Sequence, residues 1–427
     1  MKRVLRLPAY FDPEQAASSF LWKNLGDSLA ESNVYSVVYT PVPTRGVSSE
    51  VRAYYKSNRE ETRHNGKMII HRFPMFAEGK NPVFRALRYV IQGVIQFNKA
   101  VFAKDALSCN VLFIVSTPPI QGAMAALVKK CRKDHIPFIY NLQDIFPDSL
   151  VGTGLAKKDG LLWKIGRKIE DFTYRNADKI IVISEDFKKN IMAKGVPEDK
   201  IVVIYNWVDE EAVVDIPRAE NKLFDKYALD RGKFYLTYSG NIGLTQNMDM
   251  LLEVMAELQT EAPDIQLVLI GEGAYKEEVV KKIAGQASDD GAIRGTVLPN
   301  VTMLPFQPYE DIPHVFSLGD AGLVISKPGV GANSVPSKTW SIMSASRPVL
   351  ANFDENELKD IIADHHCGIF TKAGDKAAFK ASILELYHHP ELCAEYGLNG
   401  RQFVLDNLTK EVGTQKYVDV IKSFEKS

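Results

Sequence analysis

Short apolar runs alternate with helical stretches twice along this chain of 427 residues. Near-continuous apolar strands separated by helices indicate parallel sheets that are covered on both faces. In the first half the predicted strands are Arg3–Leu7, Val34–Tyr39, Val111–Ser116, Phe138–Asn141 and Ile180–Ser184. In the second half they are Phe234–Ser239, Gln266–Ile270, Val301–Leu304, Ala321–Ser326 and Val349–Ala351. The pattern therefore predicts an α/β protein with two doubly wound domains.

The length of the chain agrees with two domains, because one hydrophobic core rarely serves more than about 300 residues. The polar stretch Asn206–Lys233 is expected to contain the boundary. We expect an N-terminal domain at 1–208, a C-terminal domain at 209–404, and a last helix at 405–427 that can pack back on the first domain. Ligands of such sheets bind at the carboxyl ends of the strands, so a cleft between two facing domains is the expected site.

Composition excludes several classes of function. The net charge of −1 gives no basic field for nucleic acid. Four scattered cysteines without a C-x-x-C pair argue against a zinc ribbon or a disulfide framework and fit a reducing compartment. The N-terminus reads as a strand and a turn, and no apolar run is long enough for a membrane-spanning helix. We therefore expect a cytoplasmic protein.

Four segments are predicted to lie at carboxyl ends of strands in the second domain. They are Tyr238–Asn247, Leu269–Gly273, Leu304–Pro308 and Lys327–Asp354. Glycines in these loops allow backbone to approach a ligand closely, and Lys338 adds positive charge near a helix start. Taken singly, the segments have plainer explanations, namely a tight strand–helix turn, a helix-cap role for Glu272 and a core position for Phe306. Their convergence on one sheet edge favours a phosphate-binding site.

These segments, in this order, resemble the retaining glycosyltransferases of family 4, which have the two-Rossmann GT-B fold. The resemblance is strongest across Glu170–Asp209, with its ordered "Ala-Asp", "Ser-Glu", "Gly-Val-Pro" and "Asn-x-Val-Asp" elements. The motifs at Gly240–Asn247, Gly271–Gly273 and Pro336–Pro348 extend it. The Gly-Asn-Ile-Gly-x-x-Gln and Pro-Ser-Lys variants look most like the bacterial branch that transfers N-acetylfucosamine or similar aminosugars to lipid-linked polysaccharide precursors.

The resemblance implies a donor site in the second domain. Many relatives bind the donor diphosphate through Arg and Lys at positions that are Asn241 and Gln246 here, so Lys338 is expected to supply the missing charge. Two family glutamates, near the donor sugar and on the ribose, correspond to Asn333 and Ser341. The full set of expected donor-binding residues is Gly240, Asn241, Gly243, Gln246, Gly271, Glu272, Phe306, Asn333, Ser337, Lys338 and Ser341.

In the first domain, relatives often carry a His-Asp or related acidic motif that faces the transferred sugar or the acceptor. This chain has Gln143 and Asp144 there, so Asp144 is the candidate catalytic residue, with a helix-cap or turn role as the alternative. Glu14, in the first strand–helix loop, is a candidate acceptor contact. No metal site is expected, because the histidines form no metal-spaced cluster and the chain has no Asp-x-Asp motif.

We thus expect a retaining glycosyltransferase that moves a sugar, such as an N-acetylated aminosugar, from a UDP-linked donor to a lipid-linked saccharide in bacterial surface polysaccharide synthesis. No cofactor or obligatory metal is implied. The stretch Phe84–Lys104, rich in Phe, Val and Ile with basic residues, could lie on an anionic membrane surface or pack on the first sheet. The alternatives for the whole chain are a nucleotide-sugar epimerase of the same fold and a degenerate, binding-only relative.

Overall fold

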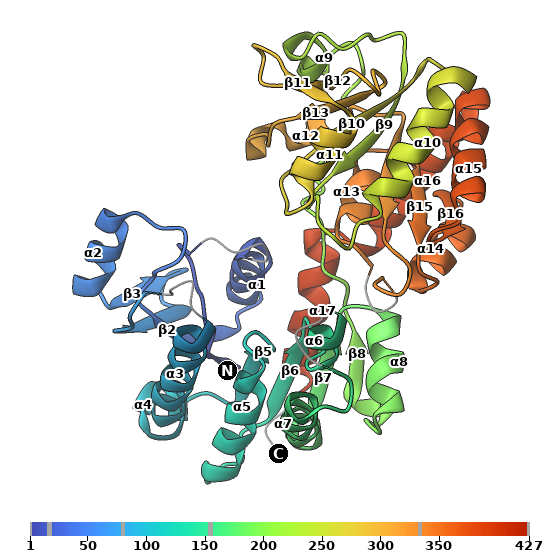
Figure 1. The fold of residues 1–427 in the computed structure, drawn as a ribbon. Helices are drawn as coiled ribbons and strands as arrows, with labels where there is room; N and C mark the ends of the chain where they lie inside the picture. Colours follow the sequence, from blue (N-terminus) through green and yellow to red (C-terminus); the bar gives the residue numbers. More distant parts are fainter. Residues whose placement is uncertain (1, 15–18, 78–81, 153–156, 332–334, 425–427) are drawn as a thin grey trace. The chain divides into compact units, whose positions relative to one another are not determined.

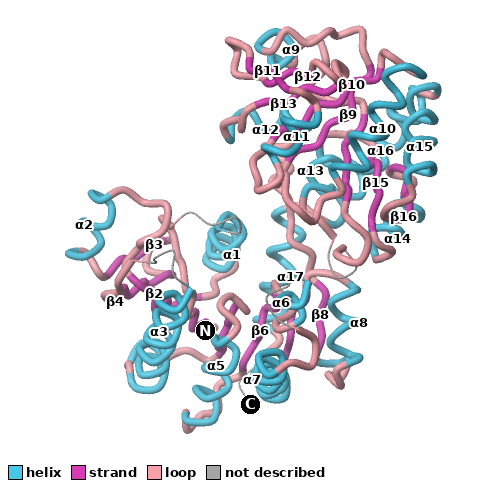
Figure 2. The backbone as a smooth tube through the Cα atoms, viewed as in Figure 1, coloured by secondary structure: helices cyan, strands magenta, loops and turns pink. Residues whose placement is uncertain are grey.

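The computed structural model describes every residue except 1, 15–18, 78–81, 153–156, 332–334 and 425–427. The chain divides into two compact units. Unit 1 comprises Met1–Tyr205 and Glu411–Ser427, and unit 2 comprises Asn206–Lys410. In both units helices flank a mostly parallel sheet (Figures 1 and 2). The predicted α/β fold with two doubly wound domains is confirmed.

The sheet of unit 1 has the strand order β3-β4-β2-β1-β5-β6-β7-β8. Only β3 runs antiparallel to its neighbour. The strands are β1 (Arg3–Arg6), β2 (Tyr35–Pro41), β3 (Glu60–Arg63), β4 (Met68–Phe73), β5 (Val111–Val115), β6 (Phe138–Leu142), β7 (Lys179–Val182) and β8 (Ile201–Val203). The chain leaves β1 for β2 on one side and later returns to β5 on the other. The carboxyl ends of β1 and β5 therefore flank a topological switch point, where ligands of such sheets bind.

The helices of unit 1 follow the strands in sequence. They are α1 (Ser19–Glu31), α2 (Ser49–Ser57), α3 (Pro82–Phe102), α4 (Lys104–Leu107), α5 (Ile120–Cys131), α6 (Asp148–Gly152), α7 (Leu161–Asn176), α8 (Glu185–Ala193) and α17 (Lys410–Lys422). Helix α5 packs closely on α7 at Gly122, where an added Cβ would lie 2.4 Å from a methyl carbon of Thr173. The last helix, α17, lies in unit 1 from Glu411 onward, although the helix before it belongs to unit 2.

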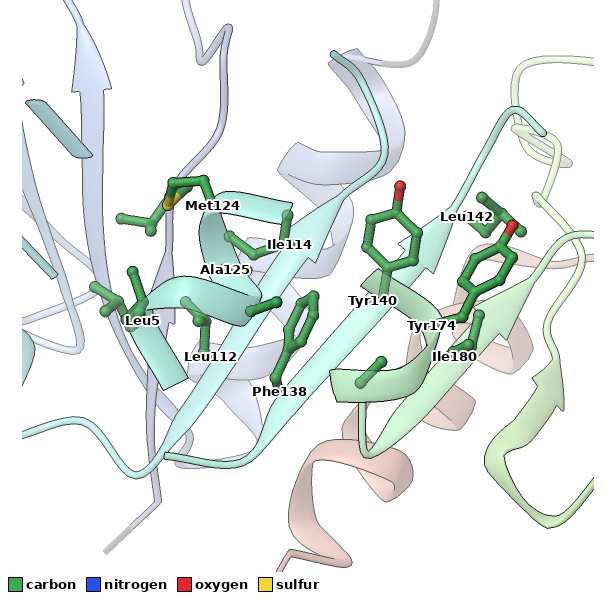
Figure 3. Packing of buried hydrophobic residues seen from close by; sticks show 14 of the residues in the cluster. Leu5, Leu112, Ile114, Met124, Ala125, Phe138, Tyr140, Leu142, Tyr174 and Ile180 are labelled. Atoms are coloured by element: carbon green, nitrogen blue, oxygen red, sulfur yellow. The ribbon is translucent and has the colours of Figure 1, made fainter. Parts of the chain in front are cut away.

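The core of unit 1 lies between its sheet and helices α5 and α7. Figure 3 shows Leu5 of β1, Leu112 of β5 and Phe138 of β6 gathered with Met124 and Ala125 of α5. All five side chains are buried. Because apolar residues of successive parallel strands meet on one face, the strand pattern seen in the sequence produces one continuous cluster on this face, and a smaller cluster of Phe11, Val38, Met68 and Ile70 is separate from it.

The sheet of unit 2 has the order β11-β12-β13-β10-β9-β14-β15-β16, with antiparallel pairing only at β11-β12 and β12-β13. Its strands are β9 (Phe234–Ser239), β10 (Ile265–Ile270), β11 (Gly285–Ala287), β12 (Ile293–Gly295), β13 (Val301–Leu304), β14 (Ala321–Ile325), β15 (Val349–Phe353) and β16 (Gly368–Lys372). Its helices are α9 (Lys222–Lys226), α10 (Met248–Glu261), α11 (Lys276–Lys282), α12 (Ile312–Phe316), α13 (Lys338–Ser344), α14 (Glu357–His365), α15 (Lys376–His388) and α16 (Pro390–Asn407). The switch point of this sheet lies between β9 and β14.

All ten strands predicted from the apolar runs are present, with ends shifted by a few residues at most. Six others were not predicted: β3, β4, β8, β11, β12 and β16. In the described part of the chain no helix is both long and apolar enough to cross a bilayer.

Candidate active site

The loops after β9 and β10 meet backbone to backbone in unit 2. Gly240 has φ of +139° and donates its N–H to the carbonyl of Ile270 at 2.9 Å. Gly271 has φ of +155°, and an added Cβ there would lie 1.9 Å from the carbonyl oxygen of Gly240. Only glycine fits such an approach. The two predicted glycines thus let the two loops pack backbone to backbone at the end of the sheet.

A cavity of about 270 Å³ opens beside these two loops. It is lined by Ser239, Gly240, Asn241, Ile270, Gly271, Glu272, Phe306, Gln307, Ile312, Val315 and Phe316. Phe306 is 75% exposed, so it is not a core residue, and its ring is available to stack on a flat ligand. The apolar wall from Ile312, Val315 and Phe316 was not expected, because α12 carries no motif and reaches the site only through the fold.

Lys338, the first residue of α13, lies against the loop after β9. Its Nζ is 3.5 Å from the centre of the Tyr238 ring, and an added Cβ on Gly240 would lie 2.9 Å from that nitrogen. Among the residues that the structure describes, Lys338 forms no ion pair. Burial lowers the pKa of Lys338 to about 7. A bound anion would offset this loss of hydration, and the contact of Lys338 with a phosphate stays a prediction.

The predicted residues Asn241, Gly243 and Gln246 brace one another. The N–H of Gly243 donates to Oε1 of Gln246 at 3.0 Å, and the side-chain amide of Asn241 lies 3.5 Å from the same oxygen. The carbonyl of Asn241 accepts from the hydroxyl of Tyr238 at 2.6 Å. An anion at the N–H of Gly243 would therefore require Gln246 to turn away.

Other predicted donor residues surround this group. Glu272 lines the cavity and pairs with Lys276 at 2.6 Å. Ser337 is exposed, and half-buried Ser341 lies one turn along α13 from Lys338. Asn333 lies outside the described residues.

Lys327, two residues after the end of β14, is a further cation, to which the sequence motifs assign no role. Its N–H donates to the carbonyl of Thr245 at 2.8 Å, which ties the loop after β14 to the loop after β9 across the switch point. Its Nζ lies 5.7 Å from the Tyr275 ring centre. In the sequence, only its position directly after a predicted strand indicated that Lys327 lies at this end of the sheet.

Asp144 follows β6 in unit 1. Its Oδ2 accepts a hydrogen bond from Ser149 Oγ at 3.0 Å. The side chain reaches solvent, yet partial desolvation and the like charge of Asp148 raise its pKa. Asp148 is held by Lys194 at 2.7 Å and by the indole of Trp163 at 3.3 Å. Asp144 is therefore the more accessible of the two carboxylates in this loop.

Glu14 lies in the loop after β1 and is only 2% exposed. Its Oε1 accepts from the N–H groups of Thr44 and Arg45 at 2.7 and 3.0 Å, and its Oε2 accepts from the N–H of Phe11 at 3.3 Å. The carboxylate thus ties two loops together. Its direct contact with an acceptor stays a prediction.

Within the described ranges, no three His, Cys, Asp or Glu side chains are grouped closely enough to hold a metal ion.

Comparison with known proteins agrees with this geometry. Residues 22–212 match the family model described as Glycosyltransferase Family 4, and residues 219–403 match the model described as Glycosyl transferases group 1. The chain is 24% identical over 395 residues, 90% of each protein, to WbjE of Pseudomonas aeruginosa, named a probable glycosyltransferase. It is 27% identical over 209 residues, 48% of each protein, to WcaI of Escherichia coli (strain K12), named for glycosyl transfer in colanic acid biosynthesis.

The fold matches that of Alr3699/HepE from Anabaena, which was crystallised in complex with UDP and glucose. The TM-score is 0.68 at 15% identity, over 99% of this chain and 100% of that one. The two family models cover most of the chain in succession, and the fold agrees with both. The chain is therefore a glycosyltransferase of the GT-B type, with a Glycosyltransferase Family 4 domain followed by a Glycosyl transferases group 1 domain.

Proposed function

We propose that this glycosyltransferase moves an N-acetylated aminosugar, with retention of configuration, from a UDP-linked donor to a lipid-linked saccharide in bacterial surface polysaccharide synthesis. The observation that carries the proposal is Lys338, a desolvated cation without an ion-pair partner in the described chain, beside the glycine loop and its cavity. A nucleoside diphosphate has the two parts that this arrangement would take, a flat base and an anionic diphosphate.

The donor is assigned to unit 2 in three parts. The base enters the cavity beside Phe306, the diphosphate lies at Gly240 and Lys338, and the ribose lies near Ser341. Negative charge grows on the departing diphosphate in the transition state, and a fixed cation in a poorly hydrated setting stabilises it more than water does. Lys338 then contributes to the rate as well as to donor affinity. Asp144, on unit 1, is assigned to the transferred sugar or the acceptor hydroxyl.

Two comparisons support the choice of substrates. HepE binds UDP and glucose in its crystal, which favours a uridine nucleotide here. WcaI is named for colanic acid biosynthesis, which favours a polysaccharide precursor as the acceptor. The choice of an aminosugar as the transferred group rests on the Gly-Asn-Ile-Gly-x-x-Gln and Pro-Ser-Lys motifs.

A lipid-linked acceptor calls for access to a membrane, and α3 supports such access. Its residues Phe84, Leu87, Ile91 and Val94 are 59%, 48%, 37% and 57% exposed. Arg85, Lys99 and Lys104 lie along the same stretch. Apolar side chains flanked by basic ones suit the surface of an anionic bilayer. We propose peripheral association at the inner face of the cytoplasmic membrane.

The donor assignment is tested with thermal shifts for a panel of nucleotides and nucleotide sugars. A ligand that binds the native state raises its melting temperature, and UDP and UDP-N-acetylated aminosugars should give the largest rise. Lys338→Ala should weaken UDP binding by about tenfold or more, as expected for lost charge-assisted contacts. Lys372→Ala, which removes an exposed lysine of β16, is the control and should bind UDP normally.

If Lys338→Ala binds UDP as well as Lys372→Ala does, the diphosphate does not lie at Lys338. Release of UDP that requires an acceptor would exclude a binding-only protein. Conversion of the donor sugar without any acceptor would instead indicate an epimerase.

We also propose that no obligatory metal takes part. Lys338, which a bound diphosphate would keep protonated, supplies positive charge beside the leaving group. Turnover should therefore persist in excess EDTA, and a loss that Mg²⁺ or Mn²⁺ restores would contradict this proposal.

A further inference from the structure

A network of charged side chains lies beside Asp144 in unit 1, and the proposed reaction assigns it no role. Lys194, the residue after α8, forms an ion pair with Asp148 at the start of α6, with its Nζ 2.7 Å from Oδ2. The same nitrogen lies 3.3 and 3.4 Å from the two carboxylate oxygens of Glu170 on α7. One lysine therefore joins α6, α7 and the end of α8.

Glu170 does not depend on Lys194 alone. Although Glu170 is only 6% exposed, its carboxylate also accepts hydrogen bonds from the hydroxyl of Tyr174 and from the guanidinium of Arg167. Burial raises the pKa of Glu170, and its three partners offset part of that rise. Loss of the Lys194 charge would therefore leave Glu170 with two partners.

Asp148 has its only ion pair within the described chain with Lys194. Its other oxygen accepts from the indole N–H of Trp163 at 3.3 Å, a partner without charge. The loop between β6 and α6 also packs on α7 at Gly166, where an added Cβ would lie 2.7 Å from Cβ of Pro147. The start of α6 is thus held by contacts other than the ion pair, whereas the charge of Asp148 is balanced by Lys194.

Asp144 is tied to the same start of α6. Ser149, which follows Asp148, donates from its Oγ to Oδ2 of Asp144 at 3.0 Å. Partial burial and the like charge of Asp148 raise the pKa of Asp144, whereas the hydrogen bond from Ser149 lowers it. Because an uncompensated carboxylate nearby disfavours ionisation, the pairing of Asp148 with Lys194 favours the anionic form of Asp144.

The titratable groups that face Asp144 in the described chain are Asp148 of α6 and Tyr140 of β6 (Figure 3). Burial raises the pKa of Tyr140 well above its ordinary value, so its hydroxyl is neutral. Behind Asp148 lie the charged groups Lys194, Glu170 and Arg167. Arg167 pairs with Glu170 and Asp171, which leaves Lys194 as the cation that acts on Asp148.

We propose that Lys194 is a positioning residue for the transfer reaction, because it neutralises Asp148 and thereby keeps Asp144 ionised. This inference rests on the proposed function, in which Asp144 acts on the transferred sugar or on the acceptor hydroxyl. An anionic carboxylate stabilises positive charge that develops on the sugar and accepts a strong hydrogen bond from a hydroxyl, and a protonated carboxyl does both less well. Lys194 acts through Asp148 and needs no contact with substrate.

The ionisation of Asp144 is measured by carbon-13 NMR on the full chain, with the γ-carboxyl carbons of aspartate labelled. The Asp144 signal is the one that is lost in Asp144→Asn. In Lys194→Met the midpoint of its pH titration should rise by roughly one pH unit, because Asp148 is then an uncompensated like charge. In Asp148→Asn the midpoint should fall, because the like charge is gone. Should Lys194→Met fail to fold, the fall in Asp148→Asn decides.

Three further variants separate charge from structure. Lys194→Arg keeps the charge and should titrate as wild type does. Lys194→Met combined with Asp148→Asn removes both charges and should return the midpoint close to that of wild type. The matched control is Lys200→Met, because Lys200 also lies against α7 but its Nζ donates to the carbonyls of Arg175 and Ala177, at 3.4 and 3.0 Å. It should leave the midpoint unchanged.

The effect on turnover is followed as release of UDP from UDP-N-acetylglucosamine, with water as the acceptor, over a range of pH. The acidic limb of kcat/KM should move upward in Lys194→Met by as much as the NMR midpoint, because that limb reports groups of the free enzyme and the substrate. The substrate and Lys338 titrate in every variant, so a difference between variants belongs to Asp144. The affinity for UDP should stay that of wild type.

The proposal is overturned if Asp144 titrates at the same pH in wild type, Lys194→Met and Asp148→Asn, or if Lys200→Met shifts the midpoint as much as Lys194→Met does. It is also overturned if the midpoint moves while the acidic limb of turnover stays in place. If wild type releases no UDP, the proposed donor function fails, and the NMR midpoints still decide whether Lys194 controls the ionisation of Asp144.

Discussion

At the scale of single residues, the burial of Lys338 makes both the stability of the protein and its affinity for UDP depend on pH. The folded protein lowers its pKa from 10.5 to about 7, so between those pH values the unfolded chain holds a proton that the folded chain lacks. The free energy of unfolding without ligand therefore gains a contribution that rises with pH across that window. Donor binding has the opposite dependence, because a diphosphate favours the charged lysine. Above pH 7 the affinity for UDP should fall by up to about tenfold per pH unit.

This dependence is measured by calorimetry in buffers of different ionisation enthalpy. At pH 8 wild type should take up close to one proton on binding UDP. Lys338→Met keeps the apolar stem on Tyr238 and should show only the protonation of UDP itself. If UDP affinity and proton uptake change with pH in the same way in wild type and Lys338→Met, the diphosphate does not lie at Lys338.

The sequence predicted residue types better than residue environments. The glycines at 240 and 271 were predicted to let backbone approach a ligand closely. In the structure they let the two loops approach each other, and their contact with a ligand stays a prediction. The burial of Lys338 against Tyr238 could not be predicted, because the two residues are a hundred positions apart and meet only when β9 and β14 are neighbours. Glu14 was predicted from its loop alone, and its bonds to Thr44 and Arg45 depend on another loop.

At the scale of elements, α3 has its polarity reversed up to Gln96, whereas Phe97, Ala100 and Val101 nearer its end pack on the core. Its inward face carries Arg88, Gln92 and Gln96, all fully buried, and Gln96 donates to the carbonyls of Pro8 and Tyr39 at 2.9 Å. Its outward face carries the exposed apolar residues. A helix that only packs on its own sheet has the opposite arrangement. The helix was predicted from its apolar content. Which of its faces is buried could be seen only in the folded structure.

The reversed helix gives a direct test of membrane binding. Replacing Leu87, Ile91 and Val94 together by serine should remove most of the flotation with anionic liposomes, since each residue buries apolar area in the interface. The protein should stay folded, because these side chains are exposed. Leu398→Ser with Leu405→Ser, on exposed positions of α16, should float as wild type does. Flotation that survives the triple change would rule out α3 as the contact.

Four of the six strands missed from the sequence lie at a sheet edge. β3 and β8 lie at the edges of their sheet, and β11 and β16 lie at the edges of the other. β3, with the sequence Glu-Glu-Thr-Arg, has no buried residue. Edge strands face water on more sides than central ones and need no apolar run, so periodicity cannot find them. β4, next to β3, alternates buried and half-buried positions over most of its length.

At the scale of the whole molecule, the chain returns to unit 1 after completing unit 2. Tyr417, Val418 and Ile421 of α17 are fully buried, and the Tyr417 hydroxyl donates to Oδ1 of Asn141 at 3.3 Å in β6. The ring of Tyr417 lies 6.0 Å from that of Phe113 in β5. The first unit is thus completed by the last residues, and its stability depends on a chain that has passed through the second unit.

A protein that ends at residue 409 tests this dependence. Losing each of three buried side chains costs about 2–5 kcal/mol, and their sum is comparable to the whole stability of a typical domain. Unit 1 should therefore lose its hydrogen-exchange protection, while unit 2 keeps its protection and still gains stability from UDP. Tyr417→Phe, which removes only the hydroxyl, should cost about 1 kcal/mol and leave both units folded. Unchanged exchange in β5 and β6 of the shortened protein would show that unit 1 folds without α17, and loss of protection in both units would show that the two fold as one.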